Sequence, residues 1–399
     1  MLGKCKENNV YPGTNDILKK INKILGYDFT PHLASLWSDD KNEAEKYVEI
    51  YTSACSLLLE QTYYARIGKF CKEKNIQLTG HPSKGDDLGL LQYFDIPGQD
   101  LVWRWILPDT PSALEGEEST QAKCSSSAMI HGKKRRNLNE CCGAYGHELT
   151  WDEMMWLGNW CIIRGVNLLV PHAFYYSIRS CRKDERPPDV GPNAKWWSNY
   201  SEYSDAFKRL CWINNDSTHV CNIAILGKAN KLPWKSAKIC FENQIDFNYI
   251  EETQLLESAQ ISKDGIQIAD MNYQGLIVEL DEDSTLNNIC KDLQSNNQIY
   301  RYTRDSDNPD LIKFIQEKSP NHISFSPQRN NLRIRHVIKN GIHYHLLFNE
   351  TKAETEAICN GLKNETTSVF NLVTGKSEPI NMNDPLRFKP YEMKVLLTS

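Results

Sequence analysis

The sequence predicts an α/β protein with three parts: a region of parallel strands, a smaller α/β unit and a terminal β-sandwich. Between residues 135 and 171, a buried strand, a capped helix and a second buried strand follow one another, which is the repeating unit of a parallel sheet. From about residue 220, shorter apolar runs alternate with helical patterns. From about residue 321, alternating strands are joined by hairpin turns, as expected for an antiparallel sandwich.

The strand, helix and strand between residues 135 and 171 have clear boundaries. Residues 135–140 read as a buried strand whose last residue is Glu140, and the small residues of CCGAYG predict a turn after it. The stretch 150–153, Thr-Trp-Asp-Glu, matches a capping box, so we expect a helix to begin there and to stop at Gly165. Residues 166–170 form a nearly continuous apolar run that ends in Pro171-His172, which is typical of a parallel strand buried on both faces.

The chain before residue 135 is first helical, and short strands then alternate with loops and a helix. Asn15 or Asp16 can cap a helix through Leu25, and a long amphipathic pattern runs from Asn42 to about Lys74. Further elements are expected as follows: a short strand over 76–79, a turn over 96–99, a strand over 100–105, a polar loop over 108–120, a helix over 121–132 and a closing helix that begins near Asn199.

Polar residues lie at or beside the end of each predicted strand of the first region. They are His81, Asp100 with Arg104, Glu140, and His172. The carboxyl ends of parallel strands open on one face, so these side chains should be neighbours. A purely structural reading is that Glu140 caps a local amide and His172 is a satisfied core histidine. Tyr175, Tyr176, Trp196 and Trp197 follow in the sequence and favour a sugar-binding surface, because aromatic rings stack on the apolar face of sugars.

Composition limits the classes of function. The net charge of −5 and the pI near 6.1 argue against nucleic acid or an acidic membrane as the main partner. No apolar run approaches the length of a membrane span, and the first residues lack the apolar core of a signal peptide. Thirteen cysteines without metal-ligand spacing suit a reducing compartment, so we expect a cytoplasmic protein. The adjacent Cys141 and Cys142 with His147 lack the usual ligand spacing, and no metal site is predicted.

The remainder of the chain predicts two accessory parts. Strands are expected over 221–226, 247–250, 275–280 and 298–302, with helices over 235–243 and 284–294, the latter capped by Ser284. This pattern is flavodoxin-like but lacks a nucleotide-binding fingerprint. In the sandwich, strands are expected over 332–338, 342–348, 369–372 and 393–397, with a turn at 339–341. His343 and His345 share one face of their strand and are interpreted as surface or packing residues.

Several stretches together resemble a group of bacterial glycoside hydrolases. They are TGHPSKGDD (79–87), YFDIPGQDLVWRW (93–105), NECCGAYG (139–146), RGVNLLVPHAFYYS (164–177) and RPPDVGPN (186–193). The group is similar to the α-L-rhamnosidase-like and family 2-like enzymes of clan A. The resemblance covers residues 1–310 well and the sandwich loosely. It implies a TIM-barrel catalytic domain over 1–216, a flavodoxin-like α/β domain over 217–310 and a β-sandwich domain over 320–399.

The resemblance also implies roles for individual residues. In clan A barrels a nucleophilic Glu ends strand seven, and counting back from the second domain places Glu140 there, as nucleophile or general base. The residues implied to contact the sugar are His81, Asp100, Trp103, Arg104, Asn139, His172, Tyr175, Asp189 and Trp196. Asp189 has a second reading as a turn residue in its Pro-rich loop. No cofactor is expected, and whether Ca²⁺ sits among the carboxylates is left open.

The resemblance does not place the general acid of such an enzyme within this sequence. By the same count, strand four, which carries the acid in these barrels, would lie at or before the start of the chain. We therefore expect the C-terminal half of a barrel that an upstream segment or a partner chain completes. Asp87 or Asp100 would be the substitute acid. The alternative is an inactive carbohydrate-binding remnant, since glycoside cleavage needs two carboxyl groups. The sugar, its anomer and the stereochemical course are not predicted.

Overall fold

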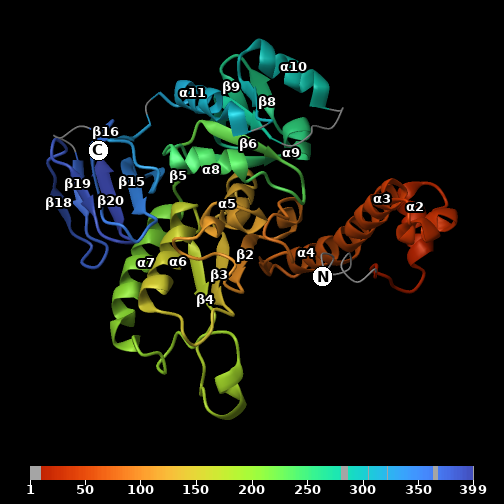
Figure 1. Ribbon diagram of the computed structural model, residues 1–399, viewed down its shortest axis with the longest axis horizontal. Helices are drawn as coiled ribbons and strands as arrows, with labels where there is room; N and C mark the ends of the chain where they lie inside the picture. The colour runs from red at the N-terminus through yellow and green to blue at the C-terminus, as the bar shows by residue number, and fades with distance from the viewer. Residues whose placement is uncertain (1–9, 280–285, 304, 321, 363–366, 399) are drawn as a thin grey trace. The chain divides into compact units, whose positions relative to one another are not determined.

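The computed structural model describes residues 10–279, 286–303, 305–320, 322–362 and 367–398. The chain divides into two compact units, residues 1–78 and 79–399, and each is described by itself (Figure 1).

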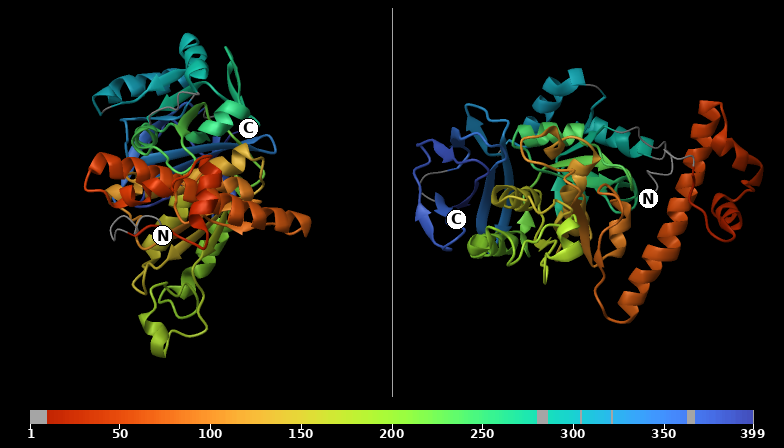
Figure 2. Two further views of the ribbon diagram at one scale, coloured as in Figure 1. Left: turned by 90° about the vertical axis from the view of Figure 1, so that its right-hand side faces the viewer. Right: turned by 60° about the horizontal axis from the view of Figure 1, so that its bottom comes forward.

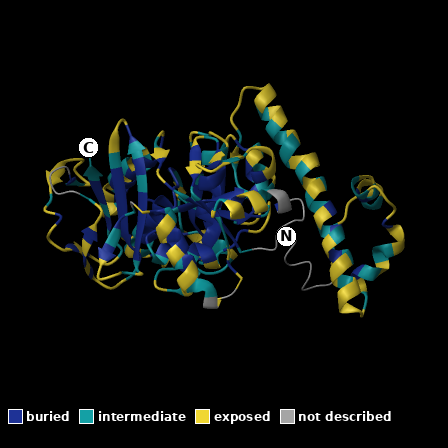
Figure 3. Ribbon diagram, turned by 90° about the horizontal axis from the view of Figure 1, so that it is seen from above, coloured by how far each residue is buried: buried dark blue, intermediate teal, exposed yellow. Residues whose placement is uncertain are grey.

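The first unit is helical, as predicted. Its helices are α2 (Ile17–Leu25), the 3-10 helix η1 (Thr30–Trp37), α3 (Lys41–Leu59), the short π-helix η2 (Glu60–Tyr64) and α4 (Ala65–Glu73). Gly26 ends α2 in the left-handed region, as its position after the last apolar residue predicts. Asp40 caps α3 by accepting bonds from the backbone N–H groups of Asn42 and Glu43. The exposed residues of α3 form a stripe along the helix (Figure 3).

The second unit opens with a parallel sheet of four strands in sequential order. The strands are β1 (Thr79–Gly80), β2 (Ile96–Val102), β3 (Leu138–Gly143) and β4 (Leu168–Pro171). The connecting helices are α5 (Gln121–His131) between β2 and β3, α6 (Trp151–Ile163) between β3 and β4, and α7 (Tyr200–Asn214) after β4. Within the described residues this sheet does not close into a barrel, so β1 and β4 are its edges.

The prediction of a turn at 96–99 and a strand at 100–105 was wrong. Residues 96–99 lie inside β2, which ends at Val102, and Trp103 and Arg104 follow with positive φ angles. Gly98 is needed in the strand because a Cβ there would lie 2.7 Å from the carbonyl oxygen of Gly80 on β1. A Pro-Gly pair that usually marks a turn therefore permits close approach of two parallel strands here.

The strand, helix and strand predicted between residues 135 and 171 are all present, and both strands lie further along the chain than expected. Thr150 and Glu153 form the predicted capping box at the start of α6, and Gly165 follows the helix with a φ of 99°. The strand expected over 135–140 lies instead at Leu138–Gly143, so Glu140 stands in its middle rather than at its end. The apolar run after α6 forms β4, two residues later than expected.

The second sheet of this unit is parallel and has the order β12-β11-β6-β7. In chain order this is 4-3-1-2, the arrangement of a flavodoxin-like sheet. Its strands are β6 (Ile223–Gly227), β7 (Phe247–Glu251), β11 (Gly275–Val278) and β12 (Ile299–Arg301), and its helices are α8 (Lys235–Glu242), α9 (Glu252–Glu257), α10 (Asn287–Ser295) and α11 (Asn308–Lys318). The predicted cap Ser284 lies outside the described residues.

A small antiparallel sheet beside these strands was not predicted. It is formed by β8 (Gln260–Ser262), β9 (Gly265–Ile268) and β10 (Met271–Tyr273). These strands have three or four residues each, too few to show a period of two in the sequence.

The last part has two antiparallel sheets. One contains β18 (Ser377–Pro379), β17 (Thr367–Phe370), β20 (Met393–Thr398), β15 (Ile342–Asn349), β14 (Leu332–Lys339) and β5 (Thr218–His219), and the other contains β13 (Ser324–Ser326), β16 (Thr355–Asn360) and β19 (Leu386–Phe388). The predicted hairpin β14–β15 turns at Asn340 and Gly341, both with positive φ, as an Asn-Gly turn of this length requires.

Buried charged residues tie the three parts of the second unit together. Lys123 on α5, with 0% exposure, donates to Asp246 and to the carbonyl oxygen of Phe247 beside β7. Asp246 also accepts from His219 on β5 at 2.6 Å and from Arg335 on β14 at 3.4 Å. Strands β6 and β11 consist entirely of buried residues, and the interior of the second unit is rich in buried residues (Figure 3). Among the described residues, no helix combines the length and apolar character that a membrane span requires.

Candidate active site

Two carboxylates lie side by side on the parallel sheet. Asp100 on β2 and Glu140 on β3 are register partners, so their side chains leave the sheet on the same face at about the strand spacing of 4.8 Å. The preceding register pair, Gln99 and Asn139, points to the opposite face, where Gln99 contacts Cys124 of α5. The carboxylates are therefore on the face away from the helices.

Two histidines flank these carboxylates. Nε2 of His81, just after β1, lies 3.9 Å from both Oδ2 of Asp100 and Oε2 of Glu140. The two carboxylate oxygens are thus at most twice 3.9 Å, about 7.8 Å, apart. Nδ1 of His172, just after β4, lies 3.0 Å from Oε1 of Glu140. The sequence prediction that these four residues are neighbours agrees with this geometry.

Asp100 has an environment unlike that of a surface carboxylate. Its side chain is 24% exposed, and its Oδ1 is buried with no hydrogen-bond partner. Burial raises the pKa of Asp100 to about 6, and the charge of Glu140 acts in the same direction, while His81 and His172 oppose it. A carboxyl group in this state can hold a proton in mildly acidic solution, which gives it the chemistry of a general acid.

Three further acidic residues near Asp100 were not predicted as a group. Asp86 and Asp87 follow β1, and Glu118 precedes α5. Burial raises the pKa of Asp86 and of Asp87 to about 6 and that of Glu118 to about 7, where neighbouring carboxylates including Asp100 add to the shift. Of the three, only Asp87 was named from the sequence, as a substitute acid, because burial of these carboxyl groups arises from the tertiary packing.

Several side chains that were predicted to contact the sugar are buried or bond other parts of the protein. Asn139 is fully buried on the helix-facing side. Arg104 donates to Glu153 of α6 and to the carbonyl oxygen of Tyr145. The indole of Trp196 donates to the carbonyl oxygen of Leu149 at 3.1 Å and packs on the core. Arg104 and Trp196 thus hold the loops around the sheet in place, whereas the side-chain amide of Asn139 has no hydrogen-bond partner.

Asp189 organises the loop that follows β4. Its carboxylate accepts bonds from the backbone N–H groups of Tyr175 at 3.3 Å, Gly191 at 2.7 Å and Asn193 at 3.2 Å, and from the Asn193 side chain. This agrees with the second reading of Asp189 as a turn residue. The segment between β4 and α7 projects from the second unit, and two views show the same projection (Figures 1 and 2).

Aromatic side chains remain accessible after β2 and β4. Trp103 is 46% exposed and lies under the guanidinium of Arg186 at 4.8 Å. Tyr175 lies under Arg182 at 5.7 Å. Trp105 and Phe174 are also exposed and were not singled out in the sequence, where single aromatic residues carry no signal of their exposure.

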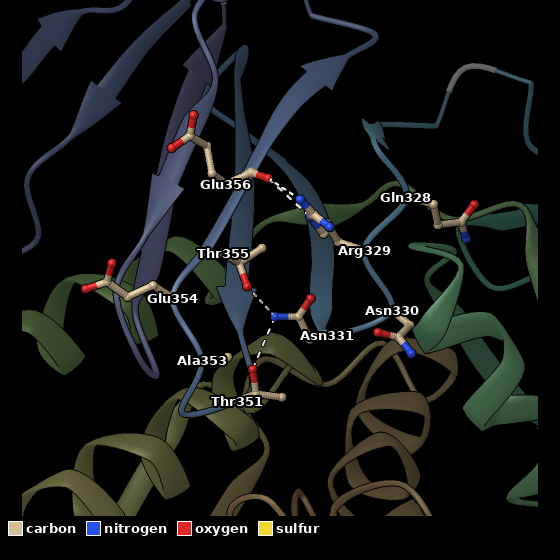
Figure 4. Close-up of a pocket in the computed structure, with 9 residues that line it drawn as sticks. All are labelled: Gln328, Arg329, Asn330, Asn331, Thr351, Ala353, Glu354, Thr355 and Glu356. Carbon is tan, nitrogen blue, oxygen red and sulfur yellow. Dashed lines mark hydrogen bonds between the residues drawn. The ribbon is translucent and has the colours of Figure 1, made fainter.

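A pocket lies elsewhere, in the sandwich part. It measures about 460 Å³ and is lined by Gln328, Arg329, Asn330, Asn331, Thr351, Ala353, Glu354, Thr355 and Glu356 (Figure 4). Asn331 donates to the hydroxyl groups of Thr351 and Thr355, and Arg329 donates to the carbonyl oxygen of Glu356. Since these groups satisfy one another and no aromatic ring lines the pocket, it is a poor candidate for the sugar site.

Solved glycoside hydrolases share the fold of this chain. A rhamnosidase from Novosphingobium sp. PP1Y matches 97% of the chain with a TM-score of 0.69 and 13% identity, and the chain spans 43% of the length of that enzyme. A beta-galactosidase from Bacillus circulans sp. alkalophilus matches 98% of the chain, and 78% of its own, with a TM-score of 0.64 and 9% identity. A cold-adapted beta-galactosidase from Rahnella sp. R3 matches 97% of the chain, and 77% of its own, with a TM-score of 0.60 and 8% identity.

No protein-family model and no curated protein sequence matches the chain. The chain therefore shares its fold with these glycoside hydrolases over nearly its whole length. The resemblance to rhamnosidase-like enzymes is confirmed at the level of the fold.

Proposed function

We propose that the chain is a glycoside hydrolase in which Glu140 is the nucleophile or general base and Asp100 is the general acid. The observation that carries the proposal is the pair of carboxyl groups on neighbouring parallel strands, at most about 7.8 Å apart, of which one has its pKa raised to about 6. Glycosidic cleavage requires two carboxyl groups in different protonation states. The limit on their separation is compatible with either retention or inversion.

The two histidines support this division of roles. Nδ1 of His81 lies 2.8 Å from the carbonyl oxygen of Pro82, and because a carbonyl oxygen only accepts, Nδ1 carries the proton. Nε2 of His81 is then left facing both carboxylates. His172 lies within hydrogen-bond distance of Glu140 and would orient that carboxylate toward the anomeric carbon. His172 therefore distinguishes Glu140 from Asp100, whereas His81 lies 3.9 Å from both carboxyl groups.

Trp103 and Tyr175 are proposed to line the sugar site. Both rings are accessible and both lie beside an arginine, so each can present a face to a sugar ring while the cation bonds a hydroxyl group. Arg104 and Trp196 are proposed to support the site through the loops, and Asn139, which is buried on the helix-facing side of the sheet, is not proposed to touch the sugar.

We further propose that other strands cover the open face of the sheet in the active enzyme, supplied by an upstream segment or a partner chain. Val170 is a register partner of Glu140 and is 41% exposed, and Leu138 and Leu168 on the same face are only half-buried. In a closed barrel these positions form a packed interior. Strands added at the edges β1 and β4 would bury them and remove the open edges.

The test compares two classes of aryl glycoside. Turnover is measured with dinitrophenyl and plain phenyl leaving groups over a panel of sugars, for the wild type, Glu140→Gln and Asp100→Asn. Glu140→Gln should abolish turnover of both. Asp100→Asn should slow the phenyl substrates by about 10²- to 10⁴-fold, the range of general acid catalysis, and leave the dinitrophenyl substrates nearly unchanged, because a good leaving group needs no proton. The exposed Glu148→Gln is the matched control.

The pH dependence gives a second readout. A general acid acts only while protonated, so turnover of the phenyl substrates should fall as the pH rises above about 6, the pKa of Asp100. This limb should be missing in Asp100→Asn. Equal loss on both leaving groups in Asp100→Asn would remove Asp100 from the role of acid. Sugar binding without turnover of any substrate would favour the inactive carbohydrate-binding protein.

A further inference from the structure

Three histidines gather on the β14–β15 hairpin of the sandwich. His336 on β14 is the direct register partner of His345 on β15, and His343 stands two residues before His345 on the same face. Leu332, Ile334 and Leu347 share this face and belong to the sandwich core. The histidines therefore continue the core-facing side of the hairpin toward its turn, where an apolar residue would be expected.

The three imidazoles are within reach of a single ion. Nε2 of His336 lies 2.9 Å from Nδ1 of His343, and one nitrogen atom from each of the three residues lies within 4.8 Å of the others. The ring centroids of His336 and His345 are 4.2 Å apart, and those of His336 and His343 are 5.1 Å apart. Tetrahedral zinc with Zn–N bonds of 2.0 to 2.1 Å holds its nitrogen ligands roughly 3.3 Å apart, a spacing that rotation of the imidazole rings can supply.

The partners of His345 distinguish its two nitrogen atoms. The residue is 4% exposed, and its Nδ1 is buried with no hydrogen-bond partner. Its Nε2 lies 3.2 Å from the hydroxyl oxygen of Thr398 on β20. A metal-bound histidine commonly has this arrangement, in which one nitrogen faces the metal and the other is held by an outer polar group. A buried nitrogen without a partner is otherwise destabilising, because it has lost its hydrogen bond to water.

The cluster of three rings is accessible from one side. His336 and His343 are half-buried, so an ion can enter from their side.

We propose that His336, His343 and His345 form a binding site for a single divalent transition metal ion of the zinc class, with Thr398 as the outer partner of His345. Imidazole ligands select zinc, copper and nickel over calcium and magnesium. Three neutral ligands leave the fourth position of a tetrahedral ion for water. This proposal departs from the sequence-based reading of His343 and His345 as surface or packing residues, because His336 joins them only through the register of the hairpin.

The test uses the purified chain freed of metal with a chelator. Cobalt(II) is titrated while its visible d–d absorption is recorded, and zinc binding is measured by calorimetry. We expect one ion per chain, a tetrahedral cobalt spectrum, and a rise in the melting temperature when zinc is added, since an ion that binds the folded state stabilises it.

Matched variants assign the ligands. His343→Ala and His345→Ala should weaken zinc binding more than about 100-fold, and Thr398→Ala about 10- to 100-fold, the range for outer-shell partners. The control is His147→Ala, an exposed histidine on the loop after β3, which should bind as the wild type does. Circular dichroism checks that each variant is folded, and half-buried His343 makes its variant the least disruptive. Absence of saturable binding, or equal affinity in folded His343→Ala and wild type, would overturn the proposal.

Discussion

Glu350 is predicted to be among the residues on which the stability of the second unit most depends. It follows β15, is 3% exposed, and accepts bonds from Arg164 at 2.8 Å and from Arg333 at 2.6 Å. Both guanidinium groups are themselves buried. Burial would raise the pKa of Glu350, but the two arginines hold it below its ordinary value, so the carboxylate is charged at neutral pH.

Glu350→Gln keeps the shape of the side chain and removes its charge. The amide oxygen can accept from one arginine, and the amide NH₂ group then faces the donors of the other. Removing one partner of a buried ion pair costs about 3 to 5 kcal/mol, because the remaining charge is buried without compensation. Here two cations depend on one carboxylate, so we expect a loss within or above this range, which is a large fraction of the ordinary stability of about 5 to 15 kcal/mol.

The assay is urea unfolding followed by near-ultraviolet circular dichroism at pH 7. The control is Glu356→Gln, which breaks an ion pair of similar length, 2.8 Å to Arg387, whose side chains are 48% and 82% exposed. An exposed pair contributes about 0 to 1 kcal/mol. Equal losses in the two variants, or a loss below about 1 kcal/mol for Glu350→Gln, would refute the argument that burial determines the strength of this interaction.

Two further predictions concern the same unit. Asp86 has its pKa raised from 3.8 to about 6 by burial, so its contribution to stability is complete below pH 3.8 and is lost as the pH rises through 6. The unfolding free energy of Asp86→Asn, measured relative to wild type, should therefore increase between pH 4 and pH 7 by up to about 3 kcal/mol; an unchanged difference would contradict the burial of this charge. Gly158→Ala in α6 should destabilise by about 1 to 3 kcal/mol because its Cβ would lie 2.4 Å from the ring of Phe207. Gly13→Ala, with nothing within 4 Å, is the control, and a Gly158→Ala protein as stable as wild type would show that the ring moves freely.

Local signals in the sequence were sufficient for the elements whose boundaries are chemically marked. The capping box of Thr150 and Glu153 fixed the start of α6, and Asn340-Gly341 fixed the hairpin of the sandwich. The β2 strand was misplaced because Pro97 and Gly98 usually mark turns. Their actual role depends on the approach of β1, which is a property of the assembled sheet.

The candidate site was predictable in its membership but not in its chemistry. The topology of a parallel sheet brings His81, Asp100, Glu140 and His172 together, although Asp100 and Glu140 lie inside β2 and β3 and not at the strand ends that the sequence predicted. The raised pKa of Asp100 could not be predicted, since it arises from neighbours on other strands and from the exclusion of water. His336 was missed for the same reason, because it meets His345 only through pairing of two strands.

The buried charges around Asp246 have a practical consequence for dissecting the molecule. Lys123 belongs to the parallel-strand region, Asp246 to the α/β part, and Arg335 to the sandwich. A fragment cut at residue 216 would carry Lys123 in its interior with no anion to neutralise it, and the complementary fragment would expose Asp246 and Arg335 to solvent. Separate expression of the parts should therefore yield aggregated or unfolded material. Crystallisation, or fusion of further strands to the parallel sheet, should start from the intact span that begins at residue 79.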